Sequence, residues 1–244
     1  MQGFDVIFFD LDHTLVDTRG QYAKGLAIAL GETYPDGYPP DFQKRFLYHH
    51  ERLWREYDAR RLPMQEVRRQ RFILAWRDFG VERSVAQADA FYETYSATLP
   101  DTLFPFPGVR ELLEKLSHRY RLGIITNGSP DLQWKKLCIT ELEGFFPEES
   151  LIISEKIGKA KPDKTVFQYA CDALSVSPSR AVMVGDNYDK DVLGARLFGM
   201  EALWLVPDPE MAKEARAMGV GETPTENPLH LLDRLQDLER QRFR

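Results

Sequence analysis

Two aspartates stand two residues apart near the start of the chain, directly behind an apolar run. They are Asp10 and Asp12 in the stretch FFDLDHTLVD, residues 8–17. Aspartate commonly caps turns and helix starts, so the pair alone fits a turn as well as a functional site. Crowded carboxylates repel each other unless a proton or cation compensates their charge, and Mg²⁺ is a natural compensating ion. The residues that surround the pair must decide between these interpretations.

Five short apolar runs are expected to form buried strands. None alternates polar with apolar residues, which is typical of a parallel sheet covered by helices on both faces. Helical patterns over 131–140, 165–174 and 189–198 separate the later runs. We therefore expect an α/β fold with a doubly wound, Rossmann-like parallel sheet. The expected strands are 6–9, 122–126, 151–154, 181–184 and 202–206.

The first two expected strands are separated by far more residues than an ordinary crossover needs. Residues 22–98 have a purely helical pattern, with apolar spacing for helices near 42–57, 67–79 and 84–99. Prolines at 100, 105 and 107 then forbid a continuous helix. We expect an all-helical cap over 19–100, inserted into a catalytic core made of 1–18 and 101–244.

Polar residues follow several of the expected strands, where ligands bind in open parallel sheets. Thr126 and Asn127 end the second strand, Lys161 lies in the loop after the third, and Asp186 follows the fourth. Ordinary alternatives exist: Lys161 could be a solvated lysine and Thr126 a strand-ending residue, and Asp189 and Asp191 could be helix-start residues. Their joint occurrence at one rim of the sheet favours a site that includes Asp10 and Asp12.

Four motifs in order resemble those of the haloacid dehalogenase-like (HAD) superfamily. They are DLDHT at 10–14, TNG around Thr126, KPD around Lys161, and GDNYDKD at 185–191. The resemblance covers almost the whole chain, and the position of the cap resembles subfamily I with a helical cap. It implies an enzyme that hydrolyses phosphomonoesters.

The resemblance also implies roles for the residues of the motifs. Asp10 would be the nucleophile that forms an aspartyl-phosphate, and Asp12 would protonate the leaving oxygen and later deprotonate water. Lys161 would oppose the phosphate charge, while Thr126 and the Asn127 backbone would donate hydrogen bonds to phosphoryl oxygens.

A magnesium ion is the implied cofactor. Its ligands would be the Asp10 carboxylate, the Asp12 backbone carbonyl and Asp186, with Asp191 and Asn187 in support. With Asp12 protonated, three carboxylate charges would then face three positive charges from Mg²⁺ and Lys161. His13 would face the leaving group and could contact substrate, although a histidine that only fills space fits equally well.

The substrate must be inferred from the cap, where residues 53–76 resemble bacterial pyrimidine 5'-nucleotidases. A base or sugar could be contacted by Tyr22, His49, Trp54 and Arg71, although helical spacing also suits Trp54, Phe72 and Trp76 to a cap core. We expect a nucleoside 5'-monophosphate phosphatase. The alternatives are a phosphatase for another metabolite, such as a sugar phosphate or phosphoglycolate, or a phosphomutase or non-catalytic binding protein. The resemblance rests on Leu53, Trp54, Tyr57, Gln65, Arg71, Phe72 and Trp76.

Composition limits the partners. The chain has 244 residues, is 43% hydrophobic and carries a formal net charge of -6, so neither nucleic acid nor an anionic membrane is favoured. No apolar run approaches the roughly 20 residues of a membrane span. Cys138 and Cys171 lack metal-type spacing and are expected to be reduced. We expect a cytoplasmic monomer or homodimer that acts on a small phosphorylated metabolite.

Overall fold

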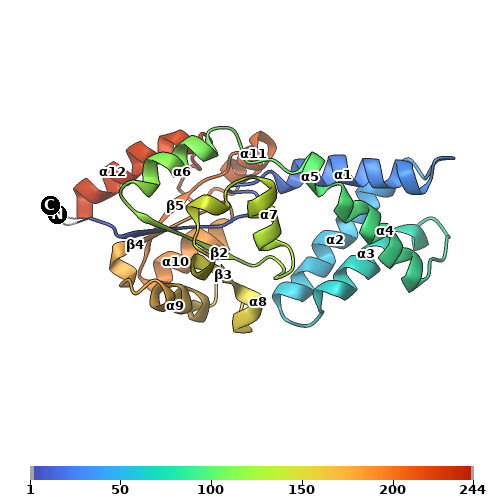
Figure 1. Cartoon of the computed structure of the whole chain (residues 1–244), viewed down its shortest axis with the longest axis horizontal. Coiled ribbons are helices and arrows are strands. Elements are labelled where there is room, and N and C mark those ends of the chain that lie inside the picture. Colours follow the sequence, from blue (N-terminus) through green and yellow to red (C-terminus); the bar gives the residue numbers. More distant parts are fainter. Residues whose placement is uncertain (1–2, 243–244) are drawn as a thin grey trace. The chain divides into compact units, whose positions relative to one another are not determined.

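The computed structural model describes residues 3–242, which include a five-stranded parallel sheet (Figure 1). The strand order is β3-β2-β1-β4-β5, so the chain winds outward from β1 in both directions. This confirms the predicted doubly wound parallel sheet. The strands are β1 (Val6–Phe9), β2 (Arg121–Thr126), β3 (Leu151–Ile153), β4 (Ala181–Gly185) and β5 (Glu201–Trp204).

The register of the central strands aligns their carboxyl ends. Phe9, the last residue of β1, pairs with Ile124 of β2 and with Val184 of β4. The residues that follow these three strands therefore emerge at the same edge of the sheet. This alignment brings together motifs that are more than a hundred residues apart in the sequence.

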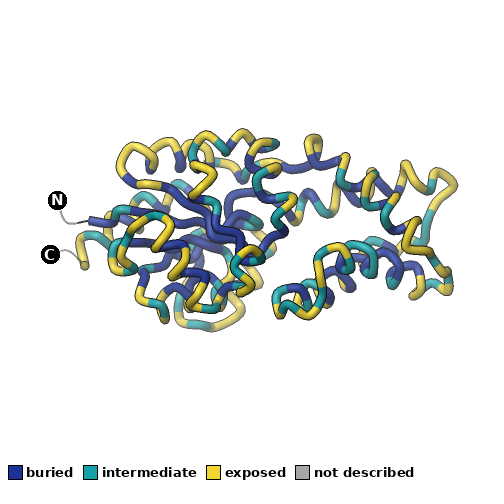
Figure 2. Tube along the Cα trace, turned by 60° about the horizontal axis from the view of Figure 1, so that its bottom comes forward, coloured by how far each residue is buried: buried dark blue, intermediate teal, exposed yellow. Residues whose placement is uncertain are grey.

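Helices cover both faces of the sheet. In Figure 1, α6 (Val109–Ser117) and α12 (Leu231–Arg242) lie on one side, and α9 (Lys164–Ala173) and α10 (Gly194–Phe198) lie on the other. Figure 2 shows the strands as the most continuously buried part of this unit, as expected for apolar runs that are covered twice. Three more α-helices accompany the sheet: α7 (Gln133–Ile139), α8 (Ser154–Ile157) and α11 (Pro209–Ala217).

One predicted helix is not a regular α-helix. Residues 189–198 divide into a π-helical turn, η4 (Tyr188–Leu193), and α10. Asn187 caps the turn, since its Oδ1 accepts a 3.0 Å hydrogen bond from the Lys190 N–H. Such wide turns occur often at functional sites, and this one carries Asp191.

Contacts between Cα positions divide the chain into two compact units. One combines the residues up to Asp17 with those from Phe104 onward, and the other is Thr18–Leu103. The second unit is all helical, and Ser84 begins α4 with a capping box to Gln87. Its helices are α1 (Thr18–Thr33), α2 (Phe42–Asp58), α3 (Met64–Arg77), α4 (Val85–Ala97) and α5 (Leu99–Thr102).

Aromatic side chains form the core of the helical unit. Phe42, Phe72 and Trp76 are buried together, and the Phe72 ring stacks on Phe91 with centroids 4.7 Å apart. The helical spacing of Phe72 and Trp76 therefore places them in the core of the unit, which was one of the two interpretations offered from sequence. Within residues 3–242, no helix has the length and apolarity needed to cross a membrane.

Candidate active site

Asp10 is fixed at the carboxyl end of β1. Its N–H donates a 2.8 Å hydrogen bond to the Val184 carbonyl, which continues the pairing with β4, and the residue is 8% exposed. Burial raises the pKa of Asp10 to about 8, against the opposing charge of Lys161 and with the neighbouring charge of Asp191 adding to the rise. The carboxylate stands where negative charge is poorly compensated.

Lys161 is the cation closest to this carboxylate. Its Nζ donates 2.6 Å hydrogen bonds to Asp10 Oδ1 and to the Ile125 carbonyl, and lies 2.6 Å from Asp191 Oδ1. Although burial opposes ionisation, the Asp10 and Asp191 charges hold the pKa of Lys161 above its usual value. The lysine therefore stays charged between two buried carboxylates.

The loop that carries Lys161 is tied to the end of β2. The Asn127 side chain accepts a 2.9 Å hydrogen bond from the Lys161 N–H and donates a 3.2 Å bond to the Lys161 carbonyl. Thr126 is 1% exposed, and its Oγ1 accepts a 3.0 Å bond from the Gly128 N–H. The resemblance implied that the Asn127 backbone donates a hydrogen bond to the phosphoryl group. The structure shows in addition that the Asn127 side chain holds the backbone of Lys161.

Asp186 follows β4 and is held by the first motif. Its Oδ1 accepts a 3.0 Å hydrogen bond from Thr14 Oγ1, and Thr14 Oγ1 in turn accepts a 3.0 Å bond from the Asp186 N–H. Burial, followed by the charge of Asp191, raises the pKa of Asp186 to about 7. Two of the carboxyl groups at the rim thus have strongly raised pKa values.

Asp191 approaches the rim from η4, across the backbone of Gly185. The Asp191 Oδ2 atom accepts a 3.0 Å hydrogen bond from the Asn187 N–H. A Cβ at Gly185 would lie 2.4 Å from the Asp191 Cγ, far inside contact distance. Only glycine permits this approach, so the first residue of the GDNYDKD motif is required by packing.

Three carboxylates meet closely enough to hold one cation. One oxygen from each of Asp10, Asp186 and Asp191 lies within 4.8 Å of the others. All are hard oxygen donors, and the raised pKa values of Asp10 and Asp186 mark a site with a deficit of positive charge. The residues present therefore fit a divalent cation.

Asp12 is paired with a residue that the sequence analysis did not single out. Lys136, on α7, donates a 2.5 Å hydrogen bond from Nζ to Asp12 Oδ1. The charge count made from sequence left out this lysine, which adds one positive charge beside Asp12. The partner lies ten residues beyond Thr126, and no motif spacing marks it.

His13 sits between Asp12 and Thr14 in a left-handed backbone conformation, with φ 64°. Burial lowers the pKa of His13, against the charges of Asp12 and Asp10, so the ring favours its neutral form. The Nδ1 atom is buried without a hydrogen-bond partner in the structure. A neutral, partly exposed ring with one unused nitrogen fits either interpretation of this histidine.

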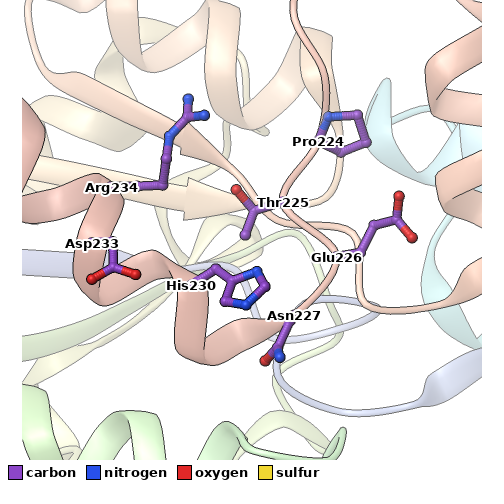
Figure 3. A pocket seen from close by; sticks show the side chains of 7 residues that line it. All are labelled: Pro224, Thr225, Glu226, Asn227, His230, Asp233 and Arg234. Carbon is purple, nitrogen blue, oxygen red and sulfur yellow. The ribbon is translucent and has the colours of Figure 1, made fainter.

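A separate hollow lies in the C-terminal part of the first unit (Figure 3). It is lined by Pro224, Thr225, Glu226, Asn227, His230, Asp233 and Arg234. None of these residues belongs to the motifs at the strand ends. The hollow therefore contains none of the site residues that were predicted from the sequence.

A family model described as haloacid dehalogenase-like hydrolase matches residues 4–199. The chain therefore belongs to the haloacid dehalogenase-like hydrolases. It is an enzyme of the phosphatase type within that family, in agreement with the names of its relatives.

The chain is similar to two curated relatives and to one solved structure. The chain is 36% identical to glyceraldehyde 3-phosphate phosphatase of Pyrococcus abyssi, over 82% of this chain and 80% of the relative. It is 31% identical to pyrimidine 5'-nucleotidase YjjG of Escherichia coli, over 95% and 97%. The crystal structure of the HAD-hydrolase YfnB from Bacillus subtilis, bound to magnesium, matches with a TM-score of 0.74 and 25% identity, covering 86% of this chain and 92% of that chain.

Proposed function

We propose that this enzyme hydrolyses phosphomonoesters through a phosphorylated Asp10, with Mg²⁺ as its cofactor. The observation that carries the proposal is the convergence of Asp10, Asp186, Asp191 and Lys161 within one largely buried cluster. In this proposal, residues up to 18 and from 101 onward are the catalytic core, and 19–100 are the cap. Asp10 and Asp186, with the Asp12 carbonyl, would hold Mg²⁺, which when bound supplies positive charge to the phosphate.

The first step forms a bond between an Asp10 oxygen and phosphorus while the bond from phosphorus to the ester oxygen breaks. Asp12 gives its proton to that departing oxygen, so an alcohol leaves instead of an alkoxide. Lys161 opposes the charge of the phosphoryl group. The Thr126 hydroxyl has its oxygen engaged by Gly128 and keeps its proton for donation to a phosphoryl oxygen.

The second step restores Asp10. Asp12, now a carboxylate, takes a proton from water as the water oxygen attacks phosphorus, and the bond between phosphorus and Asp10 breaks. Inorganic phosphate leaves, and Asp12 again carries a proton. Transfer of the phosphoryl group back to substrate is the mutase alternative, and release of free phosphate distinguishes the two.

We further propose a nucleoside 5'-monophosphate, preferably pyrimidine, as the substrate. Support comes from the near-complete coverage of the relative named pyrimidine 5'-nucleotidase and from the aromatic rings of the helical unit. Tyr22 and Trp54 are partly exposed, and the centroid of the His50 ring lies 4.8 Å from that of Tyr22 and 5.3 Å from that of Trp54. Bases are commonly bound on such ring faces.

The cap residues suggested by sequence have different surroundings in the structure. His49 contacts Asp78, with its Nε2 2.8 Å from Oδ2, so this histidine is already engaged. His50, and not His49, packs against the Tyr22 ring, and its Nδ1 lies 3.2 Å from Arg71 Nη1. Arg71 is 4% exposed and supports the aromatic rings from within the unit.

A small sugar phosphate is the second candidate. The relative named glyceraldehyde 3-phosphate phosphatase has the higher identity, 36%, although it covers less of the chain. A substrate of this type needs no aromatic surface for a base. The two candidates therefore make opposite predictions for compounds that differ only in the base.

A panel of phosphomonoesters with Mg²⁺ tests the substrate. Phosphate release should be measured for UMP, TMP, CMP and AMP, with ribose 5-phosphate as the matched compound that lacks a base, and with glyceraldehyde 3-phosphate and phosphoglycolate. We expect kcat/KM for the pyrimidine nucleotides to exceed that for ribose 5-phosphate by about tenfold or more, equivalent to about 1.4 kcal/mol. Equal values for the nucleotides and ribose 5-phosphate would remove the nucleotidase proposal and leave the phosphatase chemistry intact.

A further inference from the structure

Lys136 is a buried lysine whose charged end is directed at the first motif. The residue is 7% exposed, while Lys135, next to it on α7, is exposed. Ordering and burying a long ionic side chain is costly unless it gains a specific partner. Its partner is Asp12, 124 residues away in sequence, at 2.5 Å.

The same face of α7 also contacts the loop after β2. Gln133 precedes Lys136 by three residues, which places both side chains on one side of the helix. A Cβ at Gly128 would lie 1.8 Å from Gln133 Nε2, so the glutamine side chain packs directly on this glycine. One short helix thus supports the loop of Asp12 and the loop of Thr126.

We infer that Lys136 is a positioning residue for the proton-transferring carboxylate of Asp12. The torsion that turns a carboxylate is broad, so an aspartate at a loop does not by itself hold its oxygens in one place. The ion pair at Oδ1 selects one orientation, and the proton is then exchanged from a fixed point relative to Asp10. This inference rests on the proposed acid and base role of Asp12.

The test is the kinetics of Lys136→Met with an aryl phosphate whose phenolate leaves without protonation. Formation of phosphorylated Asp10 should stay fast, while its hydrolysis, which needs Asp12 as base, slows. We expect kcat to fall about 10- to 100-fold with KM changed less than about twofold, and a burst of phenolate equal to the enzyme sites. Lys136→Arg should restore most of kcat, and Lys135→Met is the matched control that should behave as wild type.

A double-mutant cycle with Asp12→Asn separates positioning from a merely structural role. If Lys136 acts through Asp12, then Lys136→Met has no further effect on hydrolysis of the phosphorylated enzyme once Asp12 is replaced. An equal loss in both backgrounds, or wild-type kcat in Lys136→Met, overturns the inference. If Lys136→Met fails to fold, Lys136→Gln takes its place in the cycle. Wild-type turnover of Asp12→Asn would instead show that the proposed role of Asp12 is wrong.

Discussion

The Nζ of Lys161 donates a 2.6 Å hydrogen bond to Oδ1 of Asp10, across 151 residues of sequence. Both side chains are almost fully buried, and the same Nζ lies 2.6 Å from Asp191. Breaking a buried ion pair leaves its partner uncompensated, which is more costly than the pair is worth. We therefore expect Lys161 to be important to the stability of the site.

Replacing Lys161 with methionine should destabilise the metal-free protein at pH 8. We expect a loss of about 3–5 kcal/mol in the free energy of unfolding, because two buried carboxylates lose their shared cation. Urea unfolding in the presence of a chelator measures it. Lys159→Met removes an exposed lysine of the same loop and should cost less than about 1 kcal/mol, so equal losses in the two variants would contradict the account.

The response of stability to Mg²⁺ should increase with pH. The pKa values of Asp10 and Asp186, about 8 and about 7, stand above the 3.8 of an ordinary aspartate. A raised folded-state pKa contributes stability that is full below about pH 4 and is lost as the pH rises through 7 to 8. Mg²⁺ binds the ionised carboxylates, so protons compete with it most at low pH.

The rise in Tm on adding Mg²⁺ should accordingly be larger at pH 8 than at pH 6. Thermal unfolding at the two pH values, with and without Mg²⁺, measures this difference. Asp186→Asn is the control, since it removes one raised carboxyl group and should flatten the dependence. An equal rise in the wild-type protein at both pH values would argue against a cation site on these aspartates.

Gly185→Ala should damage the site through packing alone. The new Cβ would lie 2.4 Å from the Asp191 Cγ, so the carboxylate or the end of β4 must move. We expect a loss of about 1–3 kcal/mol and a lower kcat. Gly31→Ala, in α1, meets nothing within 4 Å and should be neutral or slightly stabilising. Differential scanning calorimetry of both variants measures whether Gly185→Ala lowers the stability while Gly31→Ala does not.

Two tryptophans of the helical unit should respond differently to truncation. Trp76 is 4% exposed within the aromatic core, and Trp76→Ala should cost about 3–5 kcal/mol in stability. Trp54 is partly exposed, so Trp54→Ala should cost less and instead lower kcat/KM for UMP relative to ribose 5-phosphate. An unchanged ratio of the two substrates in Trp54→Ala would remove this ring from the proposed base site.

The strands of the parallel sheet and the residues at its rim could be predicted because each rim residue follows a short apolar run in the sequence. Asp10 follows the apolar run of β1 directly and Asp186 follows β4, so strand positions alone place both. Lys136 could not be found in this way, because its contact with Asp12 depends on how α7 folds back on the sheet. The π-helical turn at Asp191 was likewise hidden, since its pattern in sequence is that of an ordinary helix.

The histidines of the helical unit show the same limit. His49 and His50 are neighbours on α2, and sequence favoured the first as a substrate contact. In the folded unit His49 contacts Asp78, whereas His50 contacts Tyr22 and Arg71. A helix turns neighbouring side chains by about 100°, so adjacent residues meet different partners that only packing determines.

We propose that Asp10 is the residue that receives the phosphoryl group. It is tested most directly by mixing the enzyme with Mg²⁺ and a phosphomonoester substrate, quenching in acid within one turnover, and mapping phosphorylated peptides by mass spectrometry. We expect phosphate on Asp10 in the wild-type protein, and neither phosphopeptide nor turnover in a folded Asp10→Asn variant. Normal turnover by that variant, or phosphate on a different residue, would contradict it.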